Sequence, residues 1–301
     1  MHQEFLTGYF REFDYPAEGA KALLNAWDAA QNHAVLGPAL MHAVDSYVAL
    51  SPDMPEPISS LLESVRAAAA DSGVAPETVD LLFFLLCMKP LKQRYLDAGL
   101  PMSSYAGVAA DLRSKLNECY RLKGIWGTFV ASWFCRFFSL GRFVMGRLQY
   151  EKIPLPANYC PASMAHMTGK LVINVHIPSG RPLILEEVRA SMAEAAAFYA
   201  PFFPENQVIF VCHSWLLFPG HLEMLPESSG IRRFMEEFTV IDTYDDPEGH
   251  DLWRIFYRED CSNPAALPQD TSLQRAYVKW LMEGKTVGGG IGIRLMNGKG
   301  E

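Results

Sequence analysis

Charged side chains are scarce in this chain of 301 residues, at 20%, and they form no long basic run. The net charge is −8 and it is uneven: residues 1–118 hold 8 basic and 15 acidic side chains, whereas the remainder holds 18 and 19. Because neutralising the phosphates of a nucleic acid needs clustered Lys and Arg, we expect no nucleic-acid partner. Hydrophobic residues make up 50% of the chain, which excludes disorder for most of it, and its length indicates two domains.

Closely spaced cysteines, a leader and long apolar runs are missing too. The six cysteines are scattered and none forms a C-x-x-C pair, so a disulfide framework is not expected. The N-terminus has no basic segment followed by an apolar run, so the sequence predicts no signal peptide. The longest uncharged apolar stretch, residues 124–135, falls short of the roughly 20 residues that a spanning helix needs. We therefore expect a cytoplasmic protein with reduced thiols and without a membrane span.

The first half of the chain, residues 1–138, has the apolar spacing of α-helices. Apolar residues recur at i, i+3, i+4 and i+7 after Pro76 and again from Tyr105 onward. We expect the first of these helices to be interrupted at Pro90 and the second to end at Gly124. No strand-like alternation competes with this pattern. The sequence therefore predicts an all-α N-terminal domain over residues 1–138.

The second half, residues 139–301, alternates strand-like and helix-like segments. Strand patterns cover 142–150, 170–177, 207–217, 252–258 and 290–295, and helical patterns cover 185–199, 230–238 and 272–282. The segment 207–217 is almost entirely apolar, which is typical of a central strand covered on both faces. This mixture predicts the fold class α+β, with the all-α domain followed by a mixed α/β sheet domain.

The segment after the strand at 170–177 is a candidate anion site. A strand-to-helix junction exposes backbone N–H groups, and the helix dipole favours negative charge there. Gly180 allows a phosphate to approach closely and Arg181 can pair with it, whereas Pro178 and Pro182 each remove one N–H donor. An anion site and an ordinary turn are both compatible with this sequence.

The only dense cluster of reactive side chains is Cys212, His213, Ser214 and Trp215. Alternation along a strand puts His213 and Ser214 on opposite faces, so these two cannot form a nucleophile pair. Either can still pair with His176 on a neighbouring strand, where a histidine can serve as a general base. A buried histidine that is bonded to a backbone carbonyl explains the pattern equally well.

Other polar groups give weaker signals. The histidines and acidic residues of the second half match no metal-binding spacing such as H-E-x-x-H, so no metal is expected. The carboxylates at 242–248 indicate a solvated loop, from which Tyr244 can reach a site. Residues 119–150 interleave arginines with aromatic residues. This pattern suits a helix that docks the N-terminal domain on the sheet, or an amphipathic helix at a membrane surface.

Four segments carry a family resemblance. They are LGRFVMGRLQYE at 140–151, VHIPSG at 175–180, VCHSWLL at 211–217, and the stretch from LP to TSLQR at 267–275. Together they resemble bacterial acyltransferases that have an α-helical N-terminal domain and a GNAT-like C-terminal domain, which here are residues 1–138 and 139–301.

The resemblance implies a mixed sheet that splays between two central parallel strands, here 171–177 and 208–215. An acyl-CoA co-substrate inserts there, with its pantetheine on the strand backbone and its pyrophosphate on the following loop. The implied binding residues are Val175, Ile177, Ser179, Gly180 and Arg181. The loop HIPSGRP departs from the R/Q-x-x-G-x-G/A signature that such enzymes usually carry, so a different acyl carrier stays open.

The resemblance also implies an acyl-CoA-dependent N-acyltransferase that acts on an unidentified amine acceptor. His176 and His213 are the implied candidates for the base, Ser214 for a group that positions water or donates to the oxyanion, and Tyr244 for the acid. Two alternatives remain. One is a non-catalytic binding module that keeps the acyl-carrier cleft, and the other is a hydrolase or metal enzyme built on the histidines.

Overall fold

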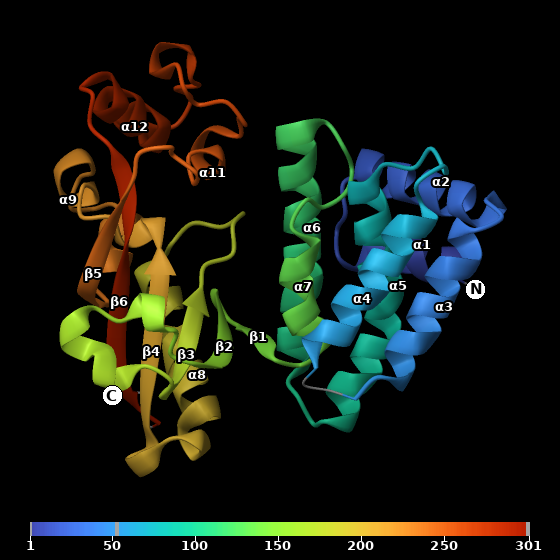
Figure 1. Ribbon diagram of the computed structural model, residues 1–301, viewed down its shortest axis with the longest axis horizontal. Helices are drawn as coiled ribbons and strands as arrows, with labels where there is room; N and C mark the ends of the chain where they lie inside the picture. The colour runs from blue at the N-terminus through green and yellow to red at the C-terminus, as the bar shows by residue number, and fades with distance from the viewer. Residues whose placement is uncertain (1, 52–53, 299–301) are drawn as a thin grey trace. The chain divides into compact units, whose positions relative to one another are not determined.

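The computed structural model describes residues 2–51 and 54–298. The chain divides into two compact units, Met1–Val144 and Met145–Glu301. The helices of the first unit are α1 (His2–Glu12), α2 (Ala17–Asn32), α3 (Leu36–Ala49), α4 (Pro55–Ala68), α5 (Pro76–Asp97), α6 (Met102–Lys123) and α7 (Ala131–Phe138) (Figure 1). In the described part of the chain no strand precedes Arg142, so the predicted all-α N-terminal region is confirmed.

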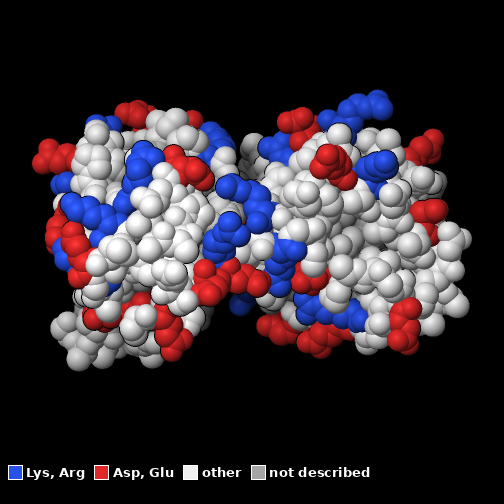
Figure 2. Space-filling model, turned by 90° about the horizontal axis from the view of Figure 1, so that it is seen from above, with Lys and Arg blue, Asp and Glu red and all other residues white. Residues whose placement is uncertain are grey.

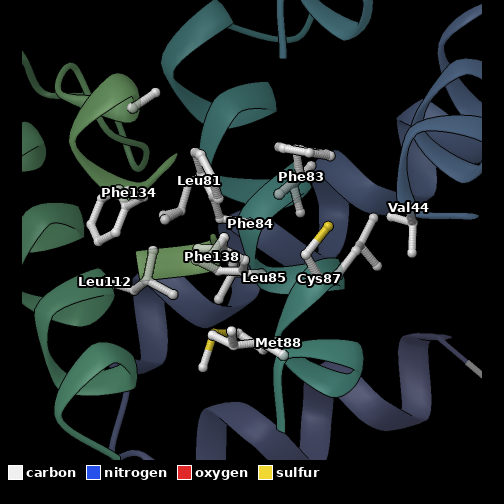
Figure 3. Close-up of a cluster of buried hydrophobic side chains, with 14 of the residues drawn as sticks. Val44, Leu81, Phe83, Phe84, Leu85, Cys87, Met88, Leu112, Phe134 and Phe138 are labelled. Carbon is white, nitrogen blue, oxygen red and sulfur yellow. The ribbon is translucent and has the colours of Figure 1, made fainter. Parts of the chain in front are cut away.

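Helix α5 forms the centre of the helical unit. It is apolar around most of its circumference, and its side chains pack on Phe134 and Phe138 of α7 (Figure 3). The ring of Phe84 lies 4.8 Å from that of Phe138. The expected interruption at Pro90 is wrong, because α5 continues through it. Burial of side chains beyond the proline, such as Tyr95, offsets the cost of the proline, which is about 3 kcal/mol.

Two other features of this unit were visible in the sequence. Gly124 ends α6 with a φ of +71°, a conformation in which glycine has no steric penalty, as predicted. Phe134, Phe137 and Phe138 of α7 are buried in the core of the helical unit and Trp133 packs against it, which explains the density of aromatic residues. No helix among the described residues is long and apolar enough to cross a membrane.

The second unit is built on a mixed sheet with the strand order β1-β2-β3-β4-β6-β5. The strands are β1 (Arg142–Met145), β2 (Leu148–Pro154), β3 (Leu171–His176), β4 (Gln207–Ser214), β5 (Thr239–Asp246) and β6 (Val287–Asn297). The helices are α8 (Leu185–Tyr199), α9 (His221–Met224), α10 (Gly230–Met235), α11 (Trp253–Phe256) and α12 (Ser272–Met282), with short 3₁₀ turns between the elements. The predicted mixed sheet is confirmed.

The two central strands run parallel but stay paired only briefly. β3 and β4 are in register at Ile173↔Phe210 and Asn174↔Val211, although β3 runs on to His176 and β4 to Ser214. The flanking pairs β2·β3 and β4·β6 are antiparallel and paired over their length. The sheet therefore parts between β3 and β4 at their carboxyl ends, which is the splay that the resemblance implied.

The two faces of this sheet differ. Helix α8 packs on one of them, where the Tyr150 hydroxyl lies 2.8 Å from Ser191 Oγ and Tyr199 donates to the carbonyl of Tyr150. The opposite face carries a small apolar cluster around Val172 and Val211. Directly opposed residues on paired strands share a face, so the register decides which side chains meet.

Three expectations about single elements are wrong. Residues 252–258 do not form a strand but contain the short helix α11, because the buried residues Leu252, Ile255 and Phe256 have helical spacing. The predicted loop at 242–248 instead lies largely in β5, an exposed edge strand without an apolar alternation. The predicted single strand at 142–150 is a hairpin that turns at Gly146, whose φ is +56°.

Charges of both signs are mixed on the face of the molecule that Figure 2 presents. Acidic and basic side chains are interspersed there over each unit. Such mixing is typical of the surface of a globular domain and differs from the single-sign stripe of a nucleic-acid interface.

Candidate active site

A row of polar side chains lies on the face of the sheet opposite α8, at the carboxyl end of β3. The register pairs Gln149 with His176 and Glu151 with Asn174 between β2 and β3. All four side chains therefore share one face. Gln149, Glu151 and Asn174 are buried, whereas His176 is partly exposed.

His176 and Glu151 form a hydrogen-bonded pair. His176 Nε2 lies 3.3 Å from Glu151 Oε2, and the side chains are 17% and 7% exposed. An ionised carboxylate only accepts hydrogen bonds, so Nε2 carries the proton and the lone pair of the neutral ring is on Nδ1. The pair thereby fixes both the tautomer and the orientation of the imidazole.

Gln149 is the most deeply buried member of the row, at 1% exposure. Neither its Oε1 nor its Nε2 has a hydrogen-bond partner. A buried carboxamide normally has partners for its donors and its acceptor. Gln149 therefore carries unused hydrogen-bonding capacity directly opposite His176.

His213 lies on β4 between two tyrosine rings. The ring centroids of Tyr159 and Tyr244 are 4.7 and 4.9 Å from that of His213. Desolvation by these neighbours lowers the pKa of His213 below its usual 6.5, against a smaller opposite effect of Asp251. Alternation from the Asn174↔Val211 register puts His213 on the same face as His176. The structure thus brings both predicted histidines to one face of neighbouring strands.

Tyr244 reaches this face from β5. Its phenol lies over Gly289 of β6, where a Cβ would overlap the Tyr244 oxygen. Glycine at this position makes room for the ring. Burial, with smaller contributions from Asp251 and Asp246, raises the pKa of Tyr244 to about 12.

Ser214 lies on the other face. Its hydroxyl oxygen accepts a hydrogen bond of 3.1 Å from the backbone N–H of Leu216 and so caps the turn that follows β4. The pairing of Ser214 with His176 that the sequence allowed does not form. The hydroxyl proton can still donate, and the role of Ser214 stays a prediction.

The loop after β3 is held by an arginine that lies far from it in sequence. The buried guanidinium of Arg147 donates to the carbonyls of Pro178, Arg181 and Pro182 at 2.9, 2.7 and 2.9 Å. Burial, and secondarily the charge of Arg181, lowers the pKa of Arg147 to about 10. In a trans peptide the N–H points away from the C=O, so carbonyls turned to Arg147 direct the next N–H groups to the opposite side. For Pro178 and Pro182 the next residues are Ser179 and Leu183.

The remaining predicted binding residues lie as follows. Val175 and Ile177 flank His176 at the end of β3, and Val175 is buried. Gly180 has a φ of +87°, a conformation that favours glycine. The side chain of Arg181 is 61% exposed and pairs with Glu187 of α8 at 2.6 Å. This carboxylate partly offsets the positive charge that Arg181 brings to the loop.

Comparisons with known proteins identify the family. Residues 4–140 match the N-acyltransferase N-terminal domain, and residues 143–294 match the GNAT-like C-terminal domain. The chain belongs to this family of N-acyltransferases. No curated protein matches it.

Solved structures share the fold of this N-acyltransferase. A mutant acyltransferase in complex with octanoyl-CoA superposes with a TM-score of 0.74 at 20% identity, over 96% of this chain and 87% of that one. An acyltransferase in complex with decanoyl-CoA and teicoplanin superposes with a TM-score of 0.67 at 20% identity, over 95% of this chain and 86% of that one. An acyltransferase in complex with decanoyl-CoA superposes with a TM-score of 0.63 at 20% identity, over 96% of this chain and 98% of that one. These likenesses support the fold.

Two histidines that the metal hypothesis considered have other partners in this N-acyltransferase. His221 is fully buried and its Nε2 lies 2.6 Å from the Tyr277 hydroxyl. Burial lowers the pKa of His221 to about 4, so it is neutral at pH 7. His250 is exposed and bonds Asp246 at 2.7 Å. Among residues 2–51 and 54–298, no group of three or more His, Cys, Asp or Glu could hold a metal ion.

Sequence reasoning missed several polar residues that the N-acyltransferase places beside the predicted histidines. Glu151 and Gln149 lie in the segment 140–151 that carried the resemblance, but their strand partners follow only from the register of β2 and β3. Arg147 was read only as one of the arginines that are interleaved with aromatic residues over 119–150. The local sequence carries no signal for these placements, because they depend on the register of the completed sheet.

Proposed function

We propose that this N-acyltransferase takes its acyl group from acyl-CoA and transfers it to an amine. The observation that carries the proposal is the splay between β3 and β4 beyond Asn174 and Val211, with His176 at its carboxyl end. Strand backbone that leaves the ladder can bond the amides of a pantetheine arm. Structures of the same fold that contain octanoyl-CoA and decanoyl-CoA support this choice of donor.

His176 is the base in this proposal. One proton of the acceptor ammonium passes to Nδ1 of His176 and then to solvent, so that the neutral amine can attack the thioester carbonyl carbon. The C–N bond forms, the C–S bond breaks, and a second proton from the nitrogen ends on the CoA sulfur. Glu151 stabilises the imidazolium that forms in the first step, because its carboxylate stays bonded to Nε2.

The other predicted residues serve binding. His213 and Tyr244 line the site on the β4 side, where the contact between their rings fixes the position of each. With a pKa of about 12, Tyr244 keeps its proton and donates a hydrogen bond. It is a poor acid for a thiolate, because a thiol has a pKa of about 8.5. Val175 and Ile177 supply backbone to the pantetheine arm.

The loop that Arg147 holds receives the pyrophosphate. Gly180 allows close approach, the N–H groups of Ser179 and Leu183 point away from Arg147, and Arg181 adds a positive charge. The loop lacks the glycine-rich signature. In this proposal Arg147 instead fixes the loop conformation, through its hydrogen bonds to the carbonyls on the side away from the pyrophosphate.

An assay of thiol release tests the proposal. Acetyl-CoA, octanoyl-CoA and decanoyl-CoA are offered with a panel of primary amines, and the acylated amine is identified by mass spectrometry. His176→Ala should lower kcat by roughly 10²–10⁴-fold, the usual contribution of a positioned base. His42→Ala, which changes an exposed histidine of the helical unit, is the control. Binding of an acyl-CoA without turnover on any amine would favour the non-catalytic module instead.

A further inference from the structure

The buried carboxamide of Gln149 has no evident structural purpose. Both of its polar atoms lack a partner at 1% exposure, so within the fold they lose their hydrogen bonds to water and gain none. A methionine of similar length would fill the same volume without that loss. The side chain therefore reduces stability, which is typical of a residue that serves a ligand.

The strand order shows on which side of His176 the unpaired carboxamide of Gln149 lies. The sheet runs β2-β3-β4, and the splay that receives the acyl thioester opens between β3 and β4. Gln149 is on β2, directly opposite His176, so it lies on the side of His176 that faces away from the splay. The thioester and Gln149 flank the base from opposite sides. Gln149 is thus placed to meet the acceptor rather than the acyl donor.

We propose that Gln149 selects the acceptor, by binding a hydroxyl or amide group next to the amine that is acylated. The inference rests on the proposed function, because it needs His176 as the base. A carboxamide offers donors and an acceptor together, and a hydroxyl or amide matches both, whereas an ether, a methyl or a second ammonium does not. The substrate class is therefore an amine with a neighbouring hydroxyl or amide, such as an amino alcohol or an amino-acid amide.

Two small amines of the same shape test the assignment. Ethanolamine and n-propylamine differ only by a hydroxyl in place of a methyl, and octanoyl-CoA serves as the donor for both. The wild-type protein should prefer ethanolamine by about tenfold or more in kcat/KM, because a buried polar group rejects an analogue that leaves it unpaired. In Gln149→Met this preference should fall to about one.

Stability provides the second readout. Gln149→Met should melt about 2–4 °C higher than the wild type, because it removes unpaired buried polar atoms. Gln207→Met, at an exposed position of β4, is the matched control and should change neither the preference nor the melting temperature. A residue with a purely structural role would instead lose stability in Gln149→Met.

The outcomes separate this inference from the proposed function. If both proteins acylate both amines, and the preference for ethanolamine is the same in the wild type and in Gln149→Met, the role of Gln149 is overturned. The proposed function then stays in place. A lower melting temperature of Gln149→Met also overturns it. Absence of transfer to every amine by the wild type is instead the failure of the proposed function, and the inference then falls with it.

Discussion

Glu151 determines which ring nitrogen of His176 carries the proton. The spacing of the two residues in the sequence did not reveal that they meet. The two residues are 25 positions apart and meet only because β2 and β3 pair with Gln149 opposite His176. A shift of the register by one residue would place Glu151 on the other face. The carboxylate keeps the proton on Nε2 and leaves the basic lone pair on Nδ1.

Glu151 is therefore a positioning residue, and substitution separates its effects. Glu151→Ala should lower kcat by about 10²-fold while the KM for octanoyl-CoA changes less than about threefold, because the donor site is left intact. The kcat of Glu151→Gln should lie between those of the wild type and Glu151→Ala. The amide oxygen can still accept a hydrogen bond from Nε2 but cannot stabilise the imidazolium by charge. Glu236→Gln, at an exposed position, is the control. A rise in KM with unchanged kcat would contradict the assignment.

His221 predicts how stability depends on pH. Its pKa is lowered to about 4 by burial, against 6.5 for an unperturbed histidine, so the unfolded state binds the proton more tightly. The stability that the neutral ring contributes is fully present above pH 6.5 and is lost as the pH falls toward 4. This loss amounts to about 3 kcal/mol from a shift of this size.

Chemical denaturation at pH 7, 5.5 and 4.5 measures this contribution. His221→Gln, whose amide can still bond the Tyr277 hydroxyl, should lose less stability over this range than the wild type. His42→Gln, which changes an exposed histidine of the helical unit, should follow the wild-type profile. An equal loss in wild type and His221→Gln would show that other groups govern acid unfolding.

Among the elements, a strand and a helix that each pack a long buried face were predicted closely, whereas the short helix α11 and the exposed edge strand β5 were not. The strand predicted at 170–177 is β3 at Leu171–His176, and the helix predicted at 185–199 is α8 at Leu185–Tyr199. β5 was missed because it is an exposed edge strand that packs no alternating apolar residues. Contacts between distant elements, such as Arg147 with the loop after β3, depend on the completed sheet and have no local signal.

The loop after β3 gives a prediction that compares two thioesters. Octanoyl-CoA has a pyrophosphate, whereas S-octanoyl-N-acetylcysteamine presents the same acyl thioester without one. Arg147→Met frees the carbonyls of Pro178, Arg181 and Pro182, so the loop loses the shape in which its N–H groups face outward. We expect kcat/KM to fall about tenfold or more for octanoyl-CoA and less than about threefold for the short thioester, a difference of the size of one charge-assisted hydrogen bond.

Arg147→Lys should not restore activity on octanoyl-CoA, because an ammonium cannot reproduce the forked contact with several carbonyls. Arg254→Met removes an exposed arginine of the same unit and serves as the control. Equal losses for both thioesters in Arg147→Met would mean that the arginine supports the unit as a whole, and the loop would then have no special dependence on it.

At the scale of the whole molecule, the chain combines a helical unit with a sheet unit, and the sequence showed this in its change of period near residue 140. The family matches meet at the same place, with residues 4–140 in one domain and 143–294 in the other. The residues proposed for donor binding all lie in the sheet unit. A ligand that binds them in the native state alone stabilises the molecule by mass action.

Octanoyl-CoA should therefore raise the melting temperature of the whole protein. At a hundredfold excess over its dissociation constant it adds about 2.7 kcal/mol, which corresponds to a shift of about 5 °C or more. Gly180→Asp places a negative charge where the pyrophosphate approaches and should abolish the shift. Gly180→Asn is the matched control: Asn and Asp both tolerate the φ of +87° better than other side chains, and they differ chiefly in charge. Loss of the shift in both variants would point to the size of the side chain or to backbone strain, and an unchanged shift in Gly180→Asp would remove this loop from the donor site.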